Sequence, residues 1–138
     1  MTSFLVDTNV LIRCLRGVPD GLGLLHRLRV GGELYMSVLS TVEVLARTWP
    51  QEEERTLALL ASFSRLPMGE DIADSAGRLL FRQARKGLTL TVPDAIVAAT
   101  ALRHNLTLVS YDSKLSMAVD GLQALDLHEG RAKAEASG

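Results

Sequence analysis

The chain has 138 residues, of which 47% are apolar, a formal net charge of −1 and one cysteine, Cys14. A chain of this length forms one domain and buries about two thirds of the surface that it exposes when unfolded. The single cysteine excludes an intrachain disulfide. No apolar run approaches the roughly 18 residues that span a bilayer, and no basic segment precedes an apolar one at the N-terminus, so we expect a soluble cytoplasmic protein without membrane contact.

The first half of the chain predicts two strands and four helices. In chain order these are a strand over 4–6, a helix over 8–16, a helix from Leu22 to Gly31, a strand over 34–37, and helices over 40–49 and 52–63. Asp7 or Thr8 can cap the first helix. Ser40 and Glu43 have the spacing of a capping box, and Pro50 interrupts the helix that they open.

The second half predicts three further helices and two or three strands. They are a weak strand or extended connection over 65–68, a helix over 71–86 that Gly87 stops, a buried helix over 93–102, a strand over 106–110, a short helix over 115–119 and a strand over 122–127. Residues 129–138 are small and polar and predict a disordered tail.

Because the strands alternate with helices, they favour a mostly parallel sheet covered on both faces. We therefore predict an α/β fold, specifically a three-layer α/β/α sandwich with a central sheet of four to five strands. Residues 1–128 form this single domain.

Four acids fall where predicted strands end and helices begin. Asp7 follows the first strand, Glu43 lies in the first turns after the second, Asp94 starts the buried helix, and Asp112 follows the strand over 106–110. Ligands collect at this edge of an open α/β sheet. Carboxylates gathered there repel each other unless protons or a cation neutralise them.

A hard divalent ion is the economical explanation for such a cluster. Mg²⁺ prefers oxygen ligands and keeps several waters, which suits a few carboxylates and a substrate phosphate. The histidines His26, His104 and His128 are far apart in sequence and lack the spacing of zinc ligands.

Each acid also has a structural interpretation that the sequence leaves open. Asp7 is readable as a helix N-cap, Glu43 as part of a capping box, and Asp112 as an Asx-turn or cap. Asp94 can be explained by the helix dipole, although an acid before an alanine-rich buried helix is costly without a partner.

Four segments, in this order and spacing, resemble the PIN-domain ribonucleases, and most of all their VapC-type toxin branch. The segments are VDTNVLI at 6–12, SVLSTVE at 37–43, PDAIVAATA at 93–101 and LVSYD at 108–112. The resemblance covers nearly the whole chain. It implies a PIN-like sandwich and metal-dependent cleavage of single-stranded or structured RNA.

By match to the family's pattern, Asp7, Glu43, Asp94 and Asp112 are its acidic quartet, and Asn9 is the polar neighbour of the first aspartate. Ser110 stands where the family often has Thr. The resemblance also implies Mg²⁺, with Mn²⁺ as a substitute, a homodimer, and a small antitoxin that fills the active-site groove of a type II toxin.

Phosphodiester hydrolysis requires an activated water and neutralised phosphoryl charge, both of which one or two Mg²⁺ ions supply. We assign Asp7, Asp94 and Asp112 as the nearest ligands, with Glu43 binding through water or holding a second ion. Asn9 and Ser110 would orient these acids by hydrogen bonds.

Basic residues suggest substrate or partner contacts less clearly. A first group of basic residues could meet RNA phosphates or form only a solvated helix face, and it consists of Arg78, Arg82, Arg85 and Lys86. A second group lies nearer the acids in the sequence and could contact RNA or an antitoxin, and it consists of Arg13, Arg16 and Arg47. Apolar residues over 22–28 and 57–63 fit either partner contacts or core packing.

Two other functions are compatible with parts of the sequence. Asp7 to Val10 is similar to the start of a haloacid-dehalogenase-type phosphatase, but that family has a second acid where this chain has Asn9. A non-catalytic RNA- or protein-binding domain on the same fold is the other alternative, although it gives no reason for all four acids.

Overall fold

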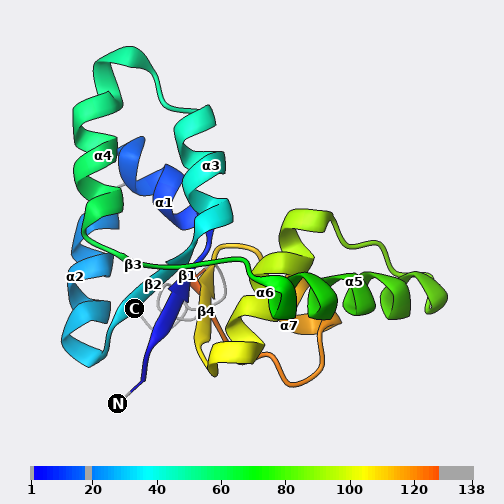
Figure 1. The fold of residues 1–138 in the computed structure, drawn as a ribbon. Coiled ribbons are helices and arrows are strands. Elements are labelled where there is room, and N and C mark those ends of the chain that lie inside the picture. Colours follow the sequence, from blue (N-terminus) through cyan, green and yellow to red (C-terminus); the bar gives the residue numbers. More distant parts are fainter. Residues whose placement is uncertain (1, 18–19, 128–138) are drawn as a thin grey trace.

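The computed structural model describes residues 2–17 and 20–127, which build one parallel sheet with helices on both sides (Figure 1). The strand order is β3-β2-β1-β4-β5, and every neighbouring pair is parallel. The strands are β1 (Phe4–Val6), β2 (Leu34–Ser37), β3 (Ser64–Leu66), β4 (Thr107–Ser110) and β5 (Ala124–Asp126). The predicted parallel sheet is thus confirmed, with five strands.

Helices connect the strands along the whole described chain. They are α1 (Thr8–Leu15), α2 (Gly21–Gly31), α3 (Val38–Ala46), the 3-10 turn η1 (Pro50–Glu52), α4 (Glu53–Ala61), α5 (Glu70–Arg85), α6 (Val92–His104) and α7 (Lys114–Ala118). None of the helices within 2–17 and 20–127 is long and apolar enough to cross a membrane. His128 and the tail predicted over 129–138 lie outside the described residues.

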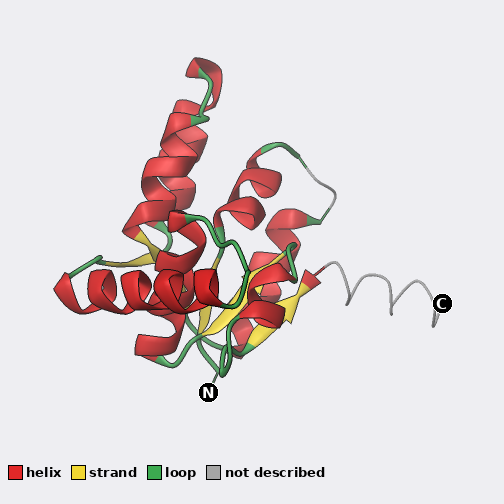
Figure 2. Cartoon of the chain, turned by 90° about the vertical axis from the view of Figure 1, so that its right-hand side faces the viewer, coloured by secondary structure: helices red, strands yellow, loops and turns green. Residues whose placement is uncertain are grey.

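The central strands β1, β2 and β4 are buried on both faces, and successive residues of each strand point to opposite faces. Leu5 of β1 and Leu108 of β4 pack in a core with α5, α6 and α7. The next residues, Val6 and Val109, pack in a second core with α1, α2, α3 and α4. Figure 2 shows the strands between these helices, so the predicted three-layer sandwich is confirmed.

The start and end of the third helix differ from the prediction. α3 begins at Val38 and not at Ser40, because Ser37 is the N-cap and its Oγ accepts a hydrogen bond from the Leu39 N–H at 3.1 Å. The predicted capping box of Ser40 and Glu43 is therefore wrong. Trp49 also lies outside the helix, since α3 ends at Ala46 and Trp49 precedes η1.

The apolar residues over 22–28 and 57–63 are partly buried and partly exposed, so the structure shows the core packing, and partner contacts stay a prediction. Leu25 and Phe63 are buried in the second core, whereas Leu22 and Leu57 are exposed. The predicted stop of α5 is confirmed, because Gly87 follows the helix with a φ of 75°, a left-handed conformation that glycine adopts without strain. Other predicted ends are shifted: α4 ends at Ala61 and not at residue 63, and α6 continues to His104 and not only to residue 102.

The strand order creates a switch point between β1 and β4. The chain proceeds from β1 outward to β2 and β3, and then returns to the other side of β1 to form β4 and β5. Helices leave the two central strands in divergent directions there, which opens a crevice beyond their carboxyl ends. Asp7 and the residues after Ser110 lie at this crevice.

Candidate active site

Asp7 is fixed at the end of β1 by three contacts. Its backbone N–H donates to the Val109 carbonyl at 3.0 Å, which continues the pairing of β1 with β4. Its Oδ1 accepts a hydrogen bond from the Thr8 N–H at 2.8 Å, and Asp7 is the N-cap of α1. Its Oδ2 accepts from the Ser110 hydroxyl at 3.0 Å. The structural interpretation as a cap is therefore confirmed, and it occupies only one carboxylate oxygen.

Asn9 and Ser110 join the start of α1 to the end of β4. The Asn9 Nδ2 donates to Ser110 Oγ at 3.1 Å and lies 3.5 Å from Asp7 Oδ2. The Asn9 Oδ1 accepts from the Tyr111 N–H at 3.2 Å, and Ser110 Oγ accepts from the Asp112 N–H at 3.0 Å. These bonds set the position of Asp112 relative to Asp7.

Glu43 reaches the same region from α3 through Thr8. The Thr8 hydroxyl donates to Glu43 Oε1 at 2.7 Å and lies 2.9 Å from the hydroxyl oxygen of Ser40. Thr8 and Ser40 are both buried. The bond therefore holds one oxygen of the half-buried Glu43 carboxylate against α1.

Asp94 and Asp112 each have at least one carboxylate oxygen without a hydrogen-bond partner among the described residues. Asp94 is half-buried in the first turn of α6, and within the described chain its side chain has no hydrogen bond or ion pair. Asp112 is exposed, and its Oδ1 accepts from the Lys114 N–H at 2.9 Å, so the predicted Asx-type contact is present. The other Asp112 oxygen remains available to a ligand.

All four predicted acids line one cavity of about 160 Å³. The other lining residues are Thr8, Asn9, Arg47, Pro93 and Val97. Among residues 2–17 and 20–127, however, no three His, Cys, Asp or Glu side chains are close enough to form a ready metal site. The acids surround the cavity without converging on one point.

Burial and the neighbouring carboxylates act on the pKa of Asp7. Burial raises the pKa of Asp7 above its ordinary value, and the nearby Asp94 and Glu43 carboxylates raise this pKa further. The hydrogen bonds from Ser110 and Thr8 lower the pKa and oppose these effects. A cation in the cavity would relieve both the burial cost and the repulsion.

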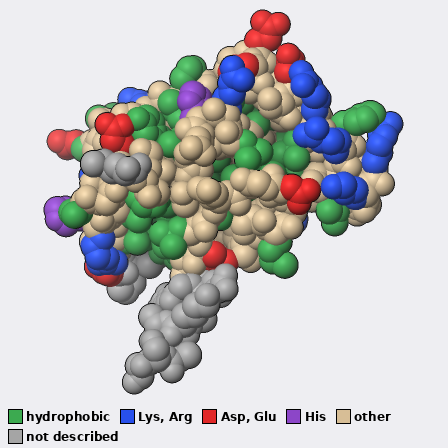
Figure 3. Space-filling model, turned by 90° about the horizontal axis from the view of Figure 1, so that it is seen from below, with side chains coloured by type: hydrophobic (Ala, Val, Ile, Leu, Met, Phe, Trp, Pro, Cys, Tyr) green, Lys and Arg blue, Asp and Glu red, His purple; other side chains and the backbone are tan. Residues whose placement is uncertain are grey.

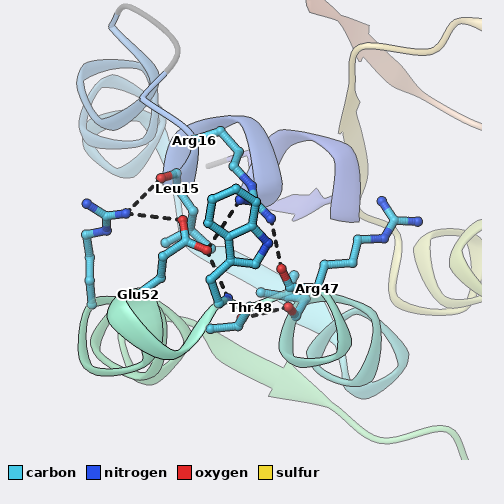
Figure 4. A network of polar contacts seen from close by, with 8 residues as sticks. Leu15, Arg16, Arg47, Thr48 and Glu52 are labelled. Atoms are coloured by element: carbon cyan, nitrogen blue, oxygen red, sulfur yellow. Dashed lines mark hydrogen bonds and ion pairs between the residues drawn. The ribbon is translucent and has the colours of Figure 1, made fainter.

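The basic residues predicted near the acids occupy three different environments. Arg47 lines the cavity, whereas the Arg13 guanidinium stacks 4.1 Å from the centre of the Tyr111 ring. Arg16 stacks on the exposed Trp49 at 4.5 Å (Figure 4). Of these three arginines, Arg47 is therefore the one placed to meet a ligand beside the acids.

A buried glutamate holds the turn that carries Arg47. Glu52 accepts from the Trp49 N–H at 3.0 Å and pairs with Arg16 at 3.4 Å, while Arg16 donates to the Arg47 carbonyl at 2.8 Å (Figure 4). Arg55 adds a second contact to Glu52 at 3.4 Å. This network ties the end of α1 to the end of α3.

Sequence reasoning missed Thr8 as a residue of the site and considered it only as a helix cap. The position of Thr8 could have revealed this role. Asp7, directly before it, already supplies the N-cap, which leaves the Thr8 hydroxyl free for another contact. The Arg47 side chain was considered but could not be separated from Arg13 and Arg16, because their stacking partners are distant in sequence.

The Ser110 hydroxyl serves Asp7, Asn9 and Asp112 together, so we expect Ser110→Ala to have two effects. The free energy of unfolding should fall by about 1–2 kcal/mol, because the Asp112 N–H and the Asn9 amide lose an acceptor. The RNA cleavage that the resemblance to PIN-domain ribonucleases implies should fall by about 10–100-fold, because the acids lose their orienting bonds. Urea unfolding and initial cleavage rates measure the two effects.

Ser116→Ala is the matched control, because Ser116 Oγ in α7 donates to the carbonyl of Ser113, the N-cap residue of the same helix, at 2.9 Å. It should change neither quantity by a comparable amount. Equal losses in the two variants would show that the bonds of Ser110 do not organise the site.

The fold and the cavity together define a class of protein, namely a parallel α/β domain with an acidic, oxygen-rich site at its switch point. The model of the PIN domain family matches residues 4–119. Ribonuclease VapC10 of Mycobacterium tuberculosis is 38% identical over 106 residues, which cover 77% of this chain and 80% of that protein. The chain belongs to the PIN-domain family.

Solved structures agree with this assignment. VapBC2 from Rickettsia felis, bound to a DNA fragment from its promoter, has a TM-score of 0.81 at 18% identity, with 91% of this chain and 98% of that chain covered. A toxin–antitoxin complex from Klebsiella pneumoniae has a TM-score of 0.68 at 29% identity, with 86% and 93% covered. The first of these likenesses concerns the fold alone.

Proposed function

We propose that this protein is a metal-dependent endoribonuclease and the toxin of a type II toxin–antitoxin pair. The family and the 38% identity to a ribonuclease support the reaction class. The observation that carries the proposal is the cavity that Asp7, Glu43, Asp94 and Asp112 share. A domain that only bound RNA or protein would have no use for four carboxylates that repel its polyanionic ligand or each other.

The donor set fits a hard divalent cation. Asp7, Glu43, Asp94 and Asp112 supply only oxygen, and no histidine or cysteine among residues 2–17 and 20–127 lines the cavity. We propose Mg²⁺, with Mn²⁺ as a substitute. Because the acids do not converge, we expect Asp7, Asp94 and Asp112 to hold the ion together with water, and Glu43 to act through water or at a second ion. When bound, the ion supplies an activated water and neutralises phosphoryl charge.

The remaining side chains orient these acids. Asn9 and Ser110 direct Asp7 Oδ2 and the backbone of Asp112, and Thr8 fixes one oxygen of Glu43. Arg47 lies at the cavity and can neutralise a phosphate oxygen. The protein thus holds Asp7, Glu43 and Asp112 by hydrogen bonds before substrate binds, which limits reorganisation during the reaction.

The contacts of Asn9 weigh against the phosphatase alternative. That reaction would need a carboxylic acid beside the aspartate nucleophile as general acid. Here the Asn9 amide donates to Ser110 and its carbonyl accepts from Tyr111. Both polar groups of Asn9 are used to join α1 to β4, so the residue has an orienting role and no proton to give.

The partners proposed are an RNA substrate and a small antitoxin. The structural neighbour from Klebsiella pneumoniae is described as a toxin–antitoxin complex, and this likeness supports an antitoxin here. The homodimer implied by the family resemblance stays a prediction, as does action in the cytoplasm, where the RNA substrate is found.

Purified protein incubated with total RNA and Mn²⁺, beside an Asp94→Asn variant, tests this function. We expect the wild type to produce discrete fragments and the variant to produce none above background, because Asp94 offers the cavity an unpartnered carboxylate. Gel electrophoresis of end-labelled RNA measures the products. Identical fragments from both preparations would contradict the proposal, since a contaminating nuclease would then explain the cleavage.

A further inference from the structure

Lys and Arg residues are unevenly distributed along the chain. Between Ser75 and Tyr111 the sequence has five Lys and Arg residues and one acid, Asp94. The whole chain has a net charge of −1, so the rest of the molecule is acidic. Figure 3 shows Lys and Arg side chains gathered on the right, the side of the molecule that α5 occupies in Figure 1. Lys and Arg side chains are thus concentrated on this side of the molecule, beside the acids at the start of α5.

Part of this positive charge lines a groove between α5 and α6. The groove has a volume of about 400 Å³, larger than the acidic cavity. Buried Leu79 and Ala99 belong to its lining. Its remaining lining residues are Ser75, Arg78, Arg82, Leu102 and Arg103. Three guanidinium groups thus border a partly apolar depression.

Two of these three arginines have no ion-pair partner among the described residues. Arg103 pairs with Asp71 at 3.1 Å. Arg78 and Arg82 form no ion pair with any other residue in the described ranges. They lie one helical turn apart on α5, at about 5–6 Å between Cβ atoms, and so present two adjacent positive groups to one ligand.

The groove is separate from the acidic cavity. Asp94 and Arg103 are both on α6, and nine residues correspond to about two and a half turns, which places them on opposite sides of the helix. They are also about 14 Å apart along the helix axis. A ligand in the groove therefore leaves the acids accessible, and one molecule must be large to occupy both places.

We propose that the groove between α5 and α6 binds the phosphate backbone of a structured RNA at a place remote from the cleaved bond. This inference rests on the proposed function, which supplies the RNA. Charge complementarity favours RNA, because a polyanion that approaches four carboxylates needs compensating cations elsewhere. Arginine forks match phosphate oxygens, and Arg13 and Arg16 are already stacked on aromatic rings.

The test compares two RNAs and two variants by fluorescence anisotropy in EDTA, which prevents cleavage. The RNAs are a folded stem–loop and a short oligonucleotide with the loop sequence alone. We expect Arg78→Gln with Arg82→Gln to raise the Kd of the stem–loop about tenfold and to lower its salt dependence by about one unit of slope per arginine. The Kd of the short oligonucleotide should not change.

Arg85→Gln is the matched control on the same helix, because Arg85 stacks on Phe81 at 3.5 Å and does not line the groove. Equal Kd values for the double variant and this control would overturn the inference. An equal rise in the Kd of the short oligonucleotide would also overturn it, because the arginines would then act at the active site. Unchanged RNA binding by the double variant, together with lost binding of a protein partner, would overturn it as well, because the groove would then be a protein-docking surface.

The inference and the proposed function fail in different ways. If the wild type cleaves neither RNA with Mn²⁺, the nuclease proposal fails, while the anisotropy comparison still decides whether the groove binds RNA. Thermal unfolding of both variants should match the wild type, since Arg78, Arg82 and Arg85 are exposed.

Discussion

Asp7→Asn should abolish RNA cleavage, with a loss of at least about 10³-fold, and should leave the fold intact. The substitution keeps the size of the side chain and an oxygen that can accept the Thr8 N–H, and Asn is as good an N-cap as Asp. It removes the negative charge at the acid nearest the switch point, and with it a ligand for a cation that activates water. Initial cleavage rates and near-ultraviolet circular dichroism measure the two outcomes.

The pH dependence of stability gives the same variant a second, independent readout. Burial raises the pKa of Asp7, so the folded protein holds this proton more tightly than the unfolded chain does. The stabilisation from this proton is complete below the ordinary pKa of 3.8 and is lost as pH rises through the higher folded value. Asp7→Asn should remove this loss and be at least as stable as the wild type at neutral pH.

A well-folded Asp7→Asn protein with full activity would refute the assignment of Asp7. A variant that is inactive and also markedly less stable at pH 7 would show that Asp7 serves mainly the fold. Asp120→Asn is the control for a lost surface charge, because Asp120 is exposed and does not line the cavity. It should change neither activity nor the pH profile of unfolding.

The sequence predicted the fold well because its signals are local. Phe4–Val6 and Leu34–Ser37 are strands with the expected bounds, since each is a short apolar run before a helix cap. Gly87 ended α5 as expected, because only a residue without a Cβ takes its φ without strain. Alternation of strands and helices then left a parallel sheet as the simple arrangement.

The start of α3 was mispredicted because two serines compete for the cap. Ser40 and Glu43 have the capping-box spacing, but Ser37 ends β2 and caps α3 with no intervening loop. Glu43 is thereby freed from a local bond and accepts instead from Thr8, 35 residues earlier. Local patterns cannot reveal such a contact, because it depends on how α1 and α3 pack.

The sequence predicted that the four acids lie together, and they line one cavity, but it did not predict the hydrogen bonds around them. The resemblance supplied Asn9 and Ser110, yet the bond between them joins residues 101 positions apart. It exists because β1 and β4 are neighbours in the sheet, an order that alternation alone does not specify. The shared cavity follows from that same strand order, since it brings Asp7 and Asp112 to one edge.

Removal of divalent metal should have an effect as large as the loss of Asp7. Cleavage should stop in EDTA and return on addition of excess Mg²⁺ or Mn²⁺, because the cavity supplies oxygen ligands only. Binding should also stabilise the fold, by about 2.7 kcal/mol at a metal concentration of 100 Kd, which corresponds to a rise in Tm of roughly 5–10 °C. Differential scanning calorimetry with and without Mn²⁺ measures this shift.

Two variants separate a metal held in the cavity from metal bound elsewhere. Asp94→Asn should lose most of the Mn²⁺-dependent rise in Tm, because it removes the carboxylate without a partner among the described residues, and Asp120→Asn should keep the rise. An equal rise in both variants would place the ion outside the cavity. Cleavage that persists in EDTA would exclude a metal-dependent reaction, and the four acids would then need another explanation. Burial and like charge raise the pKa of Asp7, and a cation bound in the cavity would oppose both effects. The metal-dependent rise in Tm therefore tests directly whether a cation neutralises this acid.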